Sequence, residues 1–442
     1  MRSALRRSAN LANYQKATSS RKNNPTSIKN FSHIVDIVNE ILIDIYDEKI
    51  EKKRLDVLMP RVQKILEDKE LTVPGVPIDK LAQNVSEALT GYGQIHHLIA
   101  DPSITNIIVV NYNLTFIMKN LRWRPIRVDF GSEQNLREFV RRVVSRLGGR
   151  YTLSSPIANV EDEDFNLRIR ATGFDISPDS PKLFIRRLSN KPLTEEQVKY
   201  AMSDSIRDFI DFCVKAKFNI GIAGTYGSGK TSLLQKMISN VPPNLHVALI
   251  QSANEIQEVH PFLTRLFTRD LVGENGKKIN ESDLLMLVKQ ITPQVLALGE
   301  FLGEEAHTMV HILQQGIQSF YTFHANDPEG AIHAYNYMVQ MSGNSSYTQS
   351  QLIEESAKYN DIMIIMDRLR VRELVQFTGN VVNGAPEYKP IFKFKVNEET
   401  AYELKGFWEK EPGVVLCDKL MRKASLAGVT VPNGFRREEV LK

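Results

Sequence analysis

Cysteine and long apolar runs are what this 442-residue chain has least of. Its two cysteines, Cys213 and Cys417, are far apart and form no CxxC pair, which excludes a disulfide framework and a thiolate zinc site. No stretch approaches the ~18 consecutive apolar residues of a membrane-spanning helix, and the first residues lack the apolar core of a secretory signal. We therefore expect a protein that stays in the cytosol.

Charge of one sign is also missing, because 56 basic residues face 52 acidic ones and the formal net charge is +4. That balance does not by itself indicate a nucleic-acid partner. The length, at roughly 150 residues per domain, predicts two or three domains. Residues 1–30 are the exception, with seven basic residues and no acidic one. They predict a disordered basic arm, either a solvated tail or a contact for a membrane surface or another anionic partner.

The remaining chain divides by its hydrophobic pattern. Apolar residues at helical spacing predict a helical extension over 31–78, and mixed patterns predict an α+β domain over 79–191. From 192 to 395 short apolar runs alternate with helical patterns, which indicates an α/β fold with a parallel sheet covered on both faces. The last segment, 396–442, is predicted to be a helical tail. The expected strands of the α/β region include Phe218–Ala223, Val247–Gln251, Val295–Leu298, Ser319–Phe323 and Ile362–Met366.

The strongest chemical signal follows the predicted strand that ends at Ala223. Glycines there would let backbone N–H groups and a helix N-terminus face phosphate groups. The lysine of such a loop neutralises the β- and γ-phosphates, and the hydroxyl after it binds Mg²⁺. The pattern GxxxxGK[ST] is complete and predicts a P-loop for ATP and Mg²⁺, formed by Gly224, Thr225, Tyr226, Gly227, Ser228, Gly229, Lys230 and Thr231 and followed by Ser232.

Two further residues are predicted to share the edge of the sheet that carries the P-loop. Glu300 follows the strand Val295–Leu298, with Gly299 standing where many P-loop proteins place a metal-binding aspartate. Glu300 is therefore the candidate to activate water and to hold Mg²⁺ through water. His324 ends the next strand and is expected at the same carboxyl edge, where a nucleotide-sensing role is favoured over a purely structural one.

In this order the three elements resemble the secretion ATPase superfamily, the hexameric motors of type II and type IV secretion and of type IV pili. The likeness is greatest to the tight-adherence (Flp) pilus assembly ATPases of the CpaF type, and it covers most of the chain from about residue 86. The resemblance implies a RecA-like ATPase domain, a homo-hexamer, and in-line attack of water on the γ-phosphate of ATP. It also implies an integral membrane protein of the apparatus as partner, at the inner face of the membrane.

The resemblance further implies that Arg168 and Arg186 reach the nucleotide from the N-terminal domain. Several departures from the family pattern accompany it. The usual glutamate-aspartate pair after the second strand is Gln251 and Ser252, which leaves Glu255 to act for that acidic box, and Leu302 replaces a common arginine. These departures leave nucleotide binding intact and put fast hydrolysis in doubt.

Two alternatives stay open. One is a degenerate nucleotide-binding scaffold with little turnover, and the other is a nucleic-acid motor, although no aromatic and basic platform for a single strand is visible. Nucleic acid is therefore not the expected direct ligand. His307 and His311 have the i, i+4 spacing of a zinc helix, but the pattern lacks the HExxH glutamate and an obvious third ligand, which favours an ordinary packed or solvated face.

Overall fold

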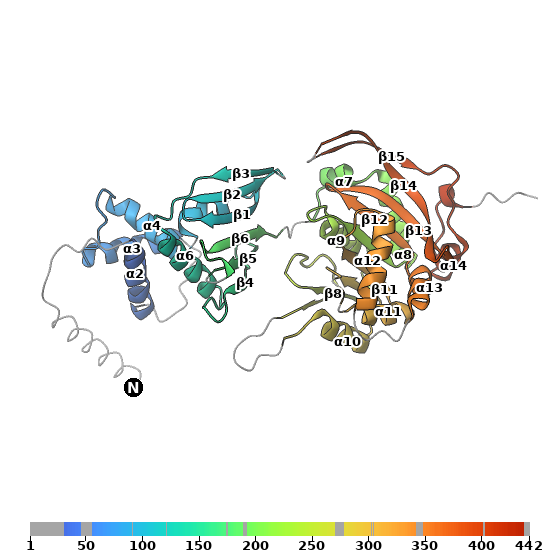
Figure 1. Cartoon of the computed structure of the whole chain (residues 1–442), viewed down its shortest axis with the longest axis horizontal. Helices are drawn as coiled ribbons and strands as arrows, with labels where there is room; N and C mark the ends of the chain where they lie inside the picture. The colour runs from blue at the N-terminus through green and yellow to red at the C-terminus, as the bar shows by residue number, and fades with distance from the viewer. Residues whose placement is uncertain are drawn as a thin grey trace, which may run out of the picture. The chain divides into compact units, whose positions relative to one another are not determined.

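The computed structural model describes residues 31–45, 55–90, 92–120, 122–173, 176–188, 192–269, 278–301, 303, 305–341, 348–400 and 403–436. The chain forms two compact units; the first ends at Arg186 and the second begins at Arg187, with residues 166–168 grouped with the second (Figure 1). The predicted basic arm lies outside the described residues. Among the helices that are described, none is both long and apolar enough to cross a membrane.

The first unit begins with three helices that bury their apolar stripes in one cluster, which includes Ile34, Val38, Leu66, Leu81 and Val85. A short 3-10 helix and α5 then lead into the sheet. The apolar spacing that predicted helices is therefore the spacing that builds this cluster. The helices are α2 (Phe31–Ile45), α3 (Leu55–Asp68), α4 (Ile78–Thr90), η1 (Gly93–Ile95) and α5 (His96–Ala100).

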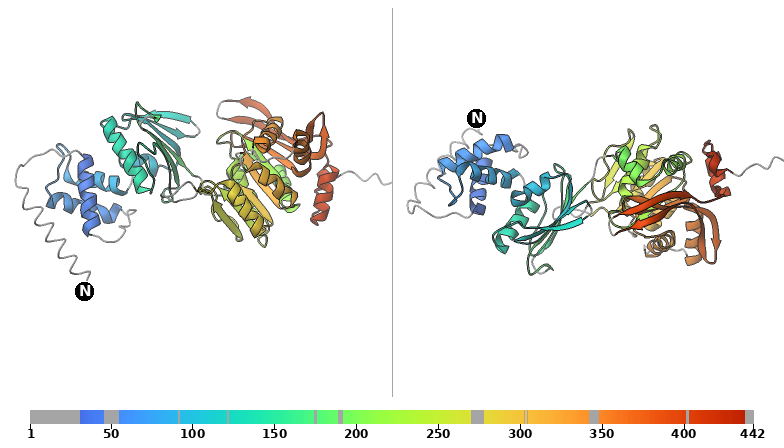
Figure 2. Two further views of the ribbon diagram at one scale, coloured as in Figure 1. Left: turned by 60° about the horizontal axis from the view of Figure 1, so that its bottom comes forward. Right: turned by 90° about the horizontal axis from the view of Figure 1, so that it is seen from above.

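The rest of the first unit is a six-stranded sheet in the order β3-β2-β1-β6-β5-β4, with α6 (Glu133–Arg146) on one face (Figure 2). The Ser132 side chain caps α6 by accepting from the Asn135 N–H, and the helix buries Phe139 and Val143. The strands are β1 (Ile104–Asn111), β2 (Leu114–Lys119), β3 (Arg122–Ile126), β4 (Ile157–Asp162), β5 (Leu167–Thr172) and β6 (Lys182–Arg187).

The second unit contains a nine-stranded sheet in the order β15-β14-β13-β12-β7-β11-β10-β8-β9. Counted along the chain as 1 to 5, the strands β7, β8, β10, β11 and β12 lie in the order 5-1-4-3-2, all parallel, as in a RecA-like P-loop domain. The predicted α/β fold class is confirmed. The strands are β7 (Ile220–Gly224), β8 (Val247–Gln251), β9 (Leu263–Phe267), β10 (Val295–Leu298), β11 (Gln318–Phe323), β12 (Ile362–Asp367), β13 (Arg370–Val382), β14 (Ala385–Glu399) and β15 (Leu404–Lys410).

Helices cover both faces of the parallel strands. Alternate residues of β7 belong to separate clusters, because Ile222 packs with α8 and α9 whereas Ala223 packs with α10 to α13. This two-sided burial explains why the strands are continuous apolar runs in the sequence. The helices are α7 (Glu195–Ala201), α8 (Asp204–Lys215), α9 (Lys230–Ser239), α10 (Glu281–Ile291), α11 (Ala306–Gln314), α12 (Pro328–Met341), α13 (Gln349–Tyr359), α14 (Asp418–Leu426) and η3 (Asn433–Phe435).

The structure differs from the helical tail expected over 396–442. β14 continues to Glu399 and β15 follows it as an antiparallel partner, so that the described part of the tail begins as a hairpin and turns helical only at α14. The reason is a long-range contact: Phe394 lies opposite Trp408, with ring centroids 5.0 Å apart. The many charged residues between them form the solvated side of an edge hairpin.

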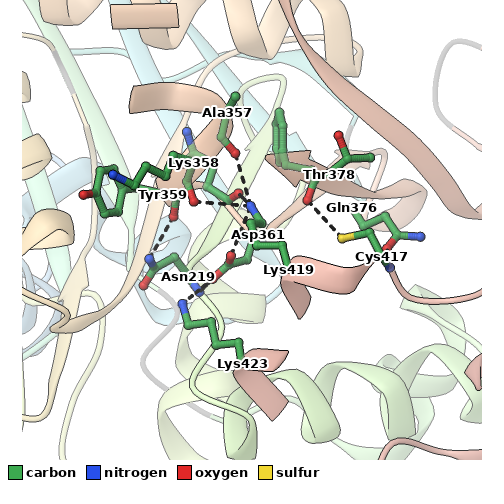
Figure 3. A network of polar contacts seen from close by, with 12 residues as sticks. Asn219, Ala357, Lys358, Tyr359, Asp361, Gln376, Thr378, Cys417, Lys419 and Lys423 are labelled. Carbon is green, nitrogen blue, oxygen red and sulfur yellow. Dashed lines mark hydrogen bonds and ion pairs between the residues drawn. The ribbon is translucent and has the colours of Figure 1, made fainter. Parts of the chain in front are cut away.

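A buried ion cluster fastens α14 to the amino ends of β7 and β12 (Figure 3). Asp361, 2% exposed, accepts from the backbone N–H of Asn219 at 2.8 Å and pairs with Lys419 at 3.3 Å and with Lys423. Lys419 also donates to the carbonyl of Ala357 at the end of α13 (3.2 Å). Burial lowers the pKa of the Lys419 amine, while Asp361 opposes that shift.

The Asp361 cluster gives the first prediction. Asp361→Asn keeps an acceptor for the Asn219 N–H but leaves the buried Lys419 ammonium without its counter-charge. We expect the free energy of unfolding of the second unit to fall by about 3 kcal/mol, the usual size of the effect when one partner of a buried pair is removed. Urea unfolding followed by Trp408 fluorescence in a Trp123→Phe background measures it.

The control for this prediction is Lys405→Met, which removes an exposed pair with Glu398 on the same sheet. We expect no measurable change in its unfolding midpoint, because exposed ion pairs contribute little. Equal stability of Asp361→Asn and the control would show that the cluster does not hold the tail.

Candidate nucleotide site at the carboxyl edge of the second sheet

The loop between β7 and α9 has the backbone geometry that its glycines predict. Gly227 and Gly229 adopt φ angles of 73° and 99°, in the left-handed region that favours glycine. A Cβ atom on Gly224 would lie 2.4 Å from the Met366 carbonyl oxygen and 2.5 Å from Ser228 Oγ. The loop therefore packs its backbone closely against β12 and leads into the N-terminus of a ten-residue helix, a suitable place for phosphate groups.

Lys230 is the buried cation of this loop. Its Nζ donates to the carbonyl oxygens of Gly224 at 3.0 Å and Thr225 at 2.9 Å. The ammonium also faces His324: Lys230 Nζ and His324 Nδ1 are 3.4 Å apart. Phosphate oxygens are stronger acceptors than these carbonyls, so the same ammonium is suited to bind the β- and γ-phosphates.

His324 lies between the P-loop and Glu300 because β11 lies between β7 and β10 in the sheet. One ring nitrogen, Nδ1, is 3.2 Å from the Gly224 carbonyl and faces Lys230; the other, Nε2, is 3.5 Å from Glu300 Oε1. Nδ1 thus faces both the Lys230 ammonium and the Gly224 carbonyl, and Nε2 faces the Glu300 carboxylate. The structure thus brings together the three predicted residues Lys230, His324 and Glu300.

The other predicted P-loop residues surround this line. Tyr226 is largely exposed, with its ring stacked beside that of His324 at a centroid distance of 6.5 Å. Ser228 is buried, Thr225 is exposed, and Thr231 and Ser232 lie half-buried in the first turn of α9. The Thr231 hydroxyl therefore has the position in the sequence and helix from which a P-loop residue binds Mg²⁺.

The acidic box follows β8, on the far side of β10 from the P-loop. Gln251 is 5% exposed and its amide makes two hydrogen bonds with Ile256: Nε2 donates to the carbonyl at 3.0 Å and Oε1 accepts from the N–H at 3.1 Å. An amide can do both whereas an ionised carboxylate cannot, so Gln251 closes the loop. Glu255 lies within that loop and is half-buried.

Gly299 lies close to the end of β8. A Cβ atom there would lie 3.2 Å from the Ile250 carbonyl oxygen and 3.3 Å from Gln251 Cβ, and its N–H donates to that carbonyl at 2.8 Å. A side chain at this position would require the end of β8 to move by a few tenths of an ångström. Glu300, one residue on, carries the carboxylate of this strand tip, whereas the departure at Leu302 lies outside the described residues.

The two arginines that the resemblance assigns to the nucleotide belong to the first sheet. Arg168 lies on β5 and Arg186 on β6, its neighbour, and both side chains are half-buried. Their role at the nucleotide stays a prediction.

The paired histidines of α11 contact each other. His307 Nε2 and His311 Nε2 are 3.1 Å apart, and His311 Nδ1 is 3.1 Å from Gln314 Oε1. Burial lowers the pKa of the His307 imidazole, which favours its neutral form. Within the described ranges, no group of three or more His, Cys, Asp or Glu side chains could hold a metal ion. The two histidines thus contact each other on one face of α11.

Sequence reasoning missed the turn between β12 and β13. This turn, Asp367–Arg370, lies beside the P-loop: a Cβ on Gly229 would be 3.5 Å from Leu369 Cδ2 and 3.7 Å from its Cα. The available signal was the short gap between the predicted strand Ile362–Met366 and the strand-like run that follows it. This gap indicated a hairpin but could not show that the hairpin lies beside the P-loop.

The chain belongs to the Type II/IV secretion system protein family, whose sequence profile matches residues 88–422. It is 23% identical over 272 residues to an uncharacterized protein of Methanocaldococcus jannaschii, and the match spans 61% of this chain but only 49% of that protein. A putative conjugal transfer protein of Mycobacterium tuberculosis (strain ATCC 25618 / H37Rv) is 23% identical over 54% of this chain and 70% of its own length. The VirB11 ATPase from the Brucella suis type IV secretion system is 17% identical in its crystal structure, with a TM-score of 0.33 over 62% of this chain and 90% of that one.

The Gln251 contacts give the second prediction. Gln251→Glu would replace the donor to the Ile256 carbonyl by a buried carboxylate oxygen facing it. We expect the free energy of unfolding to fall by about 1–3 kcal/mol, the cost of losing a buried hydrogen bond and leaving its acceptor unpaired. Urea unfolding of the full chain measures the change.

Gln257→Glu is the matched control. It makes the same change in a nearby glutamine whose side chain is half-buried. We expect that control to unfold at nearly the wild-type urea concentration. A Gln251→Glu variant as stable as wild type would mean that the loop does not need the amide.

Proposed function

We propose that this chain is an ATP-hydrolysing motor of a secretion or pilus apparatus. The observation that carries the proposal is the continuous line of contacts from Lys230 through His324 to Glu300 at the carboxyl edge of the sheet. A cation for phosphates and a carboxylate for water lie at opposite ends of that line. This is the arrangement that phosphoryl transfer to water needs, because catalysis rests on positioning and charge stabilisation.

Each residue of the line has a chemical role in this proposal. Lys230 and the N–H groups at the start of α9 bind the β- and γ-phosphates, and Glu300 orients the attacking water and accepts its proton. His324 Nδ1 faces the phosphate-binding ammonium and Nε2 faces the carboxylate, so the histidine couples phosphate binding to the position of the base. Mg²⁺ would supply charge neutralisation between the phosphates, held by the Thr231 hydroxyl and, through water, by Glu300.

The setting of the motor follows from family membership and from the resemblance to tight-adherence ATPases. In the proposal the chain assembles as a homo-hexamer in the cytoplasm, peripheral to the inner face of the membrane, and engages an integral membrane protein of the apparatus. The conjugal-transfer name of a mycobacterial relative supports a transport role. Nucleic acid is not proposed as a direct ligand.

A second function, a nucleotide-binding scaffold with little turnover, is favoured by one observation. The Gln251 amide is committed to the loop backbone, so the acidic box has no carboxylate at that position and keeps only Glu255. Fewer groups then remain to orient water, which slows hydrolysis without weakening phosphate binding.

The third prediction separates motor from scaffold. Glu300→Gln keeps the size of the side chain and removes its charge, so ATP affinity should stay near the wild-type value while Mg²⁺-dependent ATPase turnover falls by about 10²-fold, the usual contribution of a positioned base. Lys230→Ala should abolish ATP binding. Fluorescent-ATP titration and steady-state phosphate release measure the two quantities.

The matched control is Glu354→Gln, which changes an exposed carboxylate of α13 and should leave both quantities unchanged. If wild type hydrolyses ATP no faster than Glu300→Gln, the scaffold function replaces the motor. Full ATP affinity in Lys230→Ala would overturn the nucleotide site itself.

The fourth prediction concerns the arginines of the first sheet. In the proposal Arg168 and Arg186 act on the nucleotide only when the first sheet closes on it. Their alanine variants should keep ATP affinity within about threefold and lose turnover, since the lost charge stabilises the transition state. Arg124→Ala, an exposed arginine of β3, is the control. Equal losses of ATP binding and of thermal stability would mark Arg168 and Arg186 as structural.

A further inference from the structure

The turn between β12 and β13 forms one side of the P-loop. β12 runs parallel to β7 as far as the pair Met366 and Gly224, and the chain then turns at Asp367–Arg370. Met366 closely approaches the first glycine of the loop, and Leu369 lies in van der Waals range of the position that a Cβ on Gly229 would take. The first and the last glycines of the GxxxxGK[ST] pattern, Gly224 and Gly229, therefore both face this turn.

The backbone of the turn is strained. Its two central residues, Arg368 and Leu369, have φ angles of 44° and 65°. Two-residue hairpins with both central residues in this region strongly prefer Asn-Gly, because a Cβ atom is unfavourable there. A leucine at the second position makes the turn less stable than glycine would. Backbone strain of this kind is often found at residues whose side chains have a function.

The side chains on either side of Leu369 are held by other contacts. Arg368 pairs with Asp367 at 3.2 Å and with Glu399 at 2.5 Å. Arg370 donates to the Tyr200 carbonyl at 2.8 Å, and its guanidinium lies 3.9 Å from the centre of the Tyr200 ring. Of the four turn residues only Leu369 is exposed, at 38%, so the fixed arginines present one apolar side chain beside the P-loop.

The order of the strands sets the direction in which a nucleotide would lie. His324 and Glu300, which face the γ-phosphate in the proposed function, are on β11 and β10, on one side of β7. With its γ-phosphate at that side, the nucleotide must extend its nucleoside toward the other side of β7. That other side is β12 and the turn that follows it.

We propose that the turn Asp367–Arg370 is the wall for the nucleobase and that Leu369 packs on the face of the base. The inference rests on the proposed function, since it places a further part of the same ligand. A leucine side chain cannot form hydrogen bonds with phosphate or with ribose hydroxyls, whereas a flat heteroaromatic ring makes favourable van der Waals contact with an apolar side chain. In this proposal Leu369 binds the base through apolar contact, and the P-loop binds the phosphates.

Separate binding of base and phosphates makes the wall testable with two probes, ATP and inorganic tripolyphosphate, each titrated calorimetrically with Mg²⁺ into the full chain. Leu369→Ala should weaken ATP binding about five- to tenfold, the loss expected for truncating a leucine in contact, and leave tripolyphosphate binding unchanged. Leu287→Ala is the matched control, because Leu287 on α10 is also 38% exposed. It should bind both probes as wild type does.

Leu369→Gly adds a readout that does not depend on ligand. Glycine relieves the strained φ angle, so the midpoint of thermal unfolding without ligand should rise by about 2–4 °C while ATP affinity falls as in Leu369→Ala. Stabilisation together with weaker ATP binding identifies a residue kept for contact with ligand. A Leu369→Gly variant that loses stability would instead identify Leu369 as a packing residue and overturn the wall.

The outcomes distinguish this inference from the proposed function. If wild type binds ATP and Leu369→Ala binds it equally well, the wall is wrong and the motor proposal stands. If Leu369→Ala loses tripolyphosphate as well as ATP, the turn supports the P-loop and not the base, which also overturns the wall. Failure of wild type to bind either probe would refute the proposed function and the wall together.

Discussion

The second unit depends on the compensation of one buried negative charge. Asp361 lies at the amino end of β12, beside Asn219, which precedes β7. Its carboxylate accepts from the Asn219 N–H and pairs with Lys419 and Lys423 of α14. Without those partners the carboxylate would be costly to bury. Because β7 leads directly into the P-loop, the cluster and the loop lie at opposite ends of the same strand.

The arrangement of the side chains in the candidate site depends on the order of the strands more than on any single residue. β11 separates the P-loop strand from the strand that carries Glu300, and this spacing leaves room for one imidazole between a lysine and a carboxylate. The same order places the strained hairpin on the opposite side of the loop. The loop therefore has polar side chains on one side and an apolar one on the other, which in the proposal contact the two ends of the nucleotide.

Local signals in the sequence were sufficient wherever the structure is local. Val247–Gln251 and Val295–Leu298 are strands with the predicted bounds because each is a run buried on both faces, and the P-loop glycines have the φ angles that their pattern requires. The failures have long-range causes. β15 depends on Trp408 meeting Phe394, and the position of Leu369 depends on the pairing of β12 with β7. No periodicity encodes these contacts.

The anchoring of α14 has a consequence for the order in which the protein becomes functional during synthesis. The P-loop is made early in the second unit, at residues 224–231, but the lysines that complete the Asp361 cluster are at 419 and 423. The ion cluster that holds α14 can therefore form only after almost two hundred further residues have been translated. A chain that ended before α14 would therefore carry the complete P-loop sequence but would leave the Asp361 carboxylate without its two lysine partners.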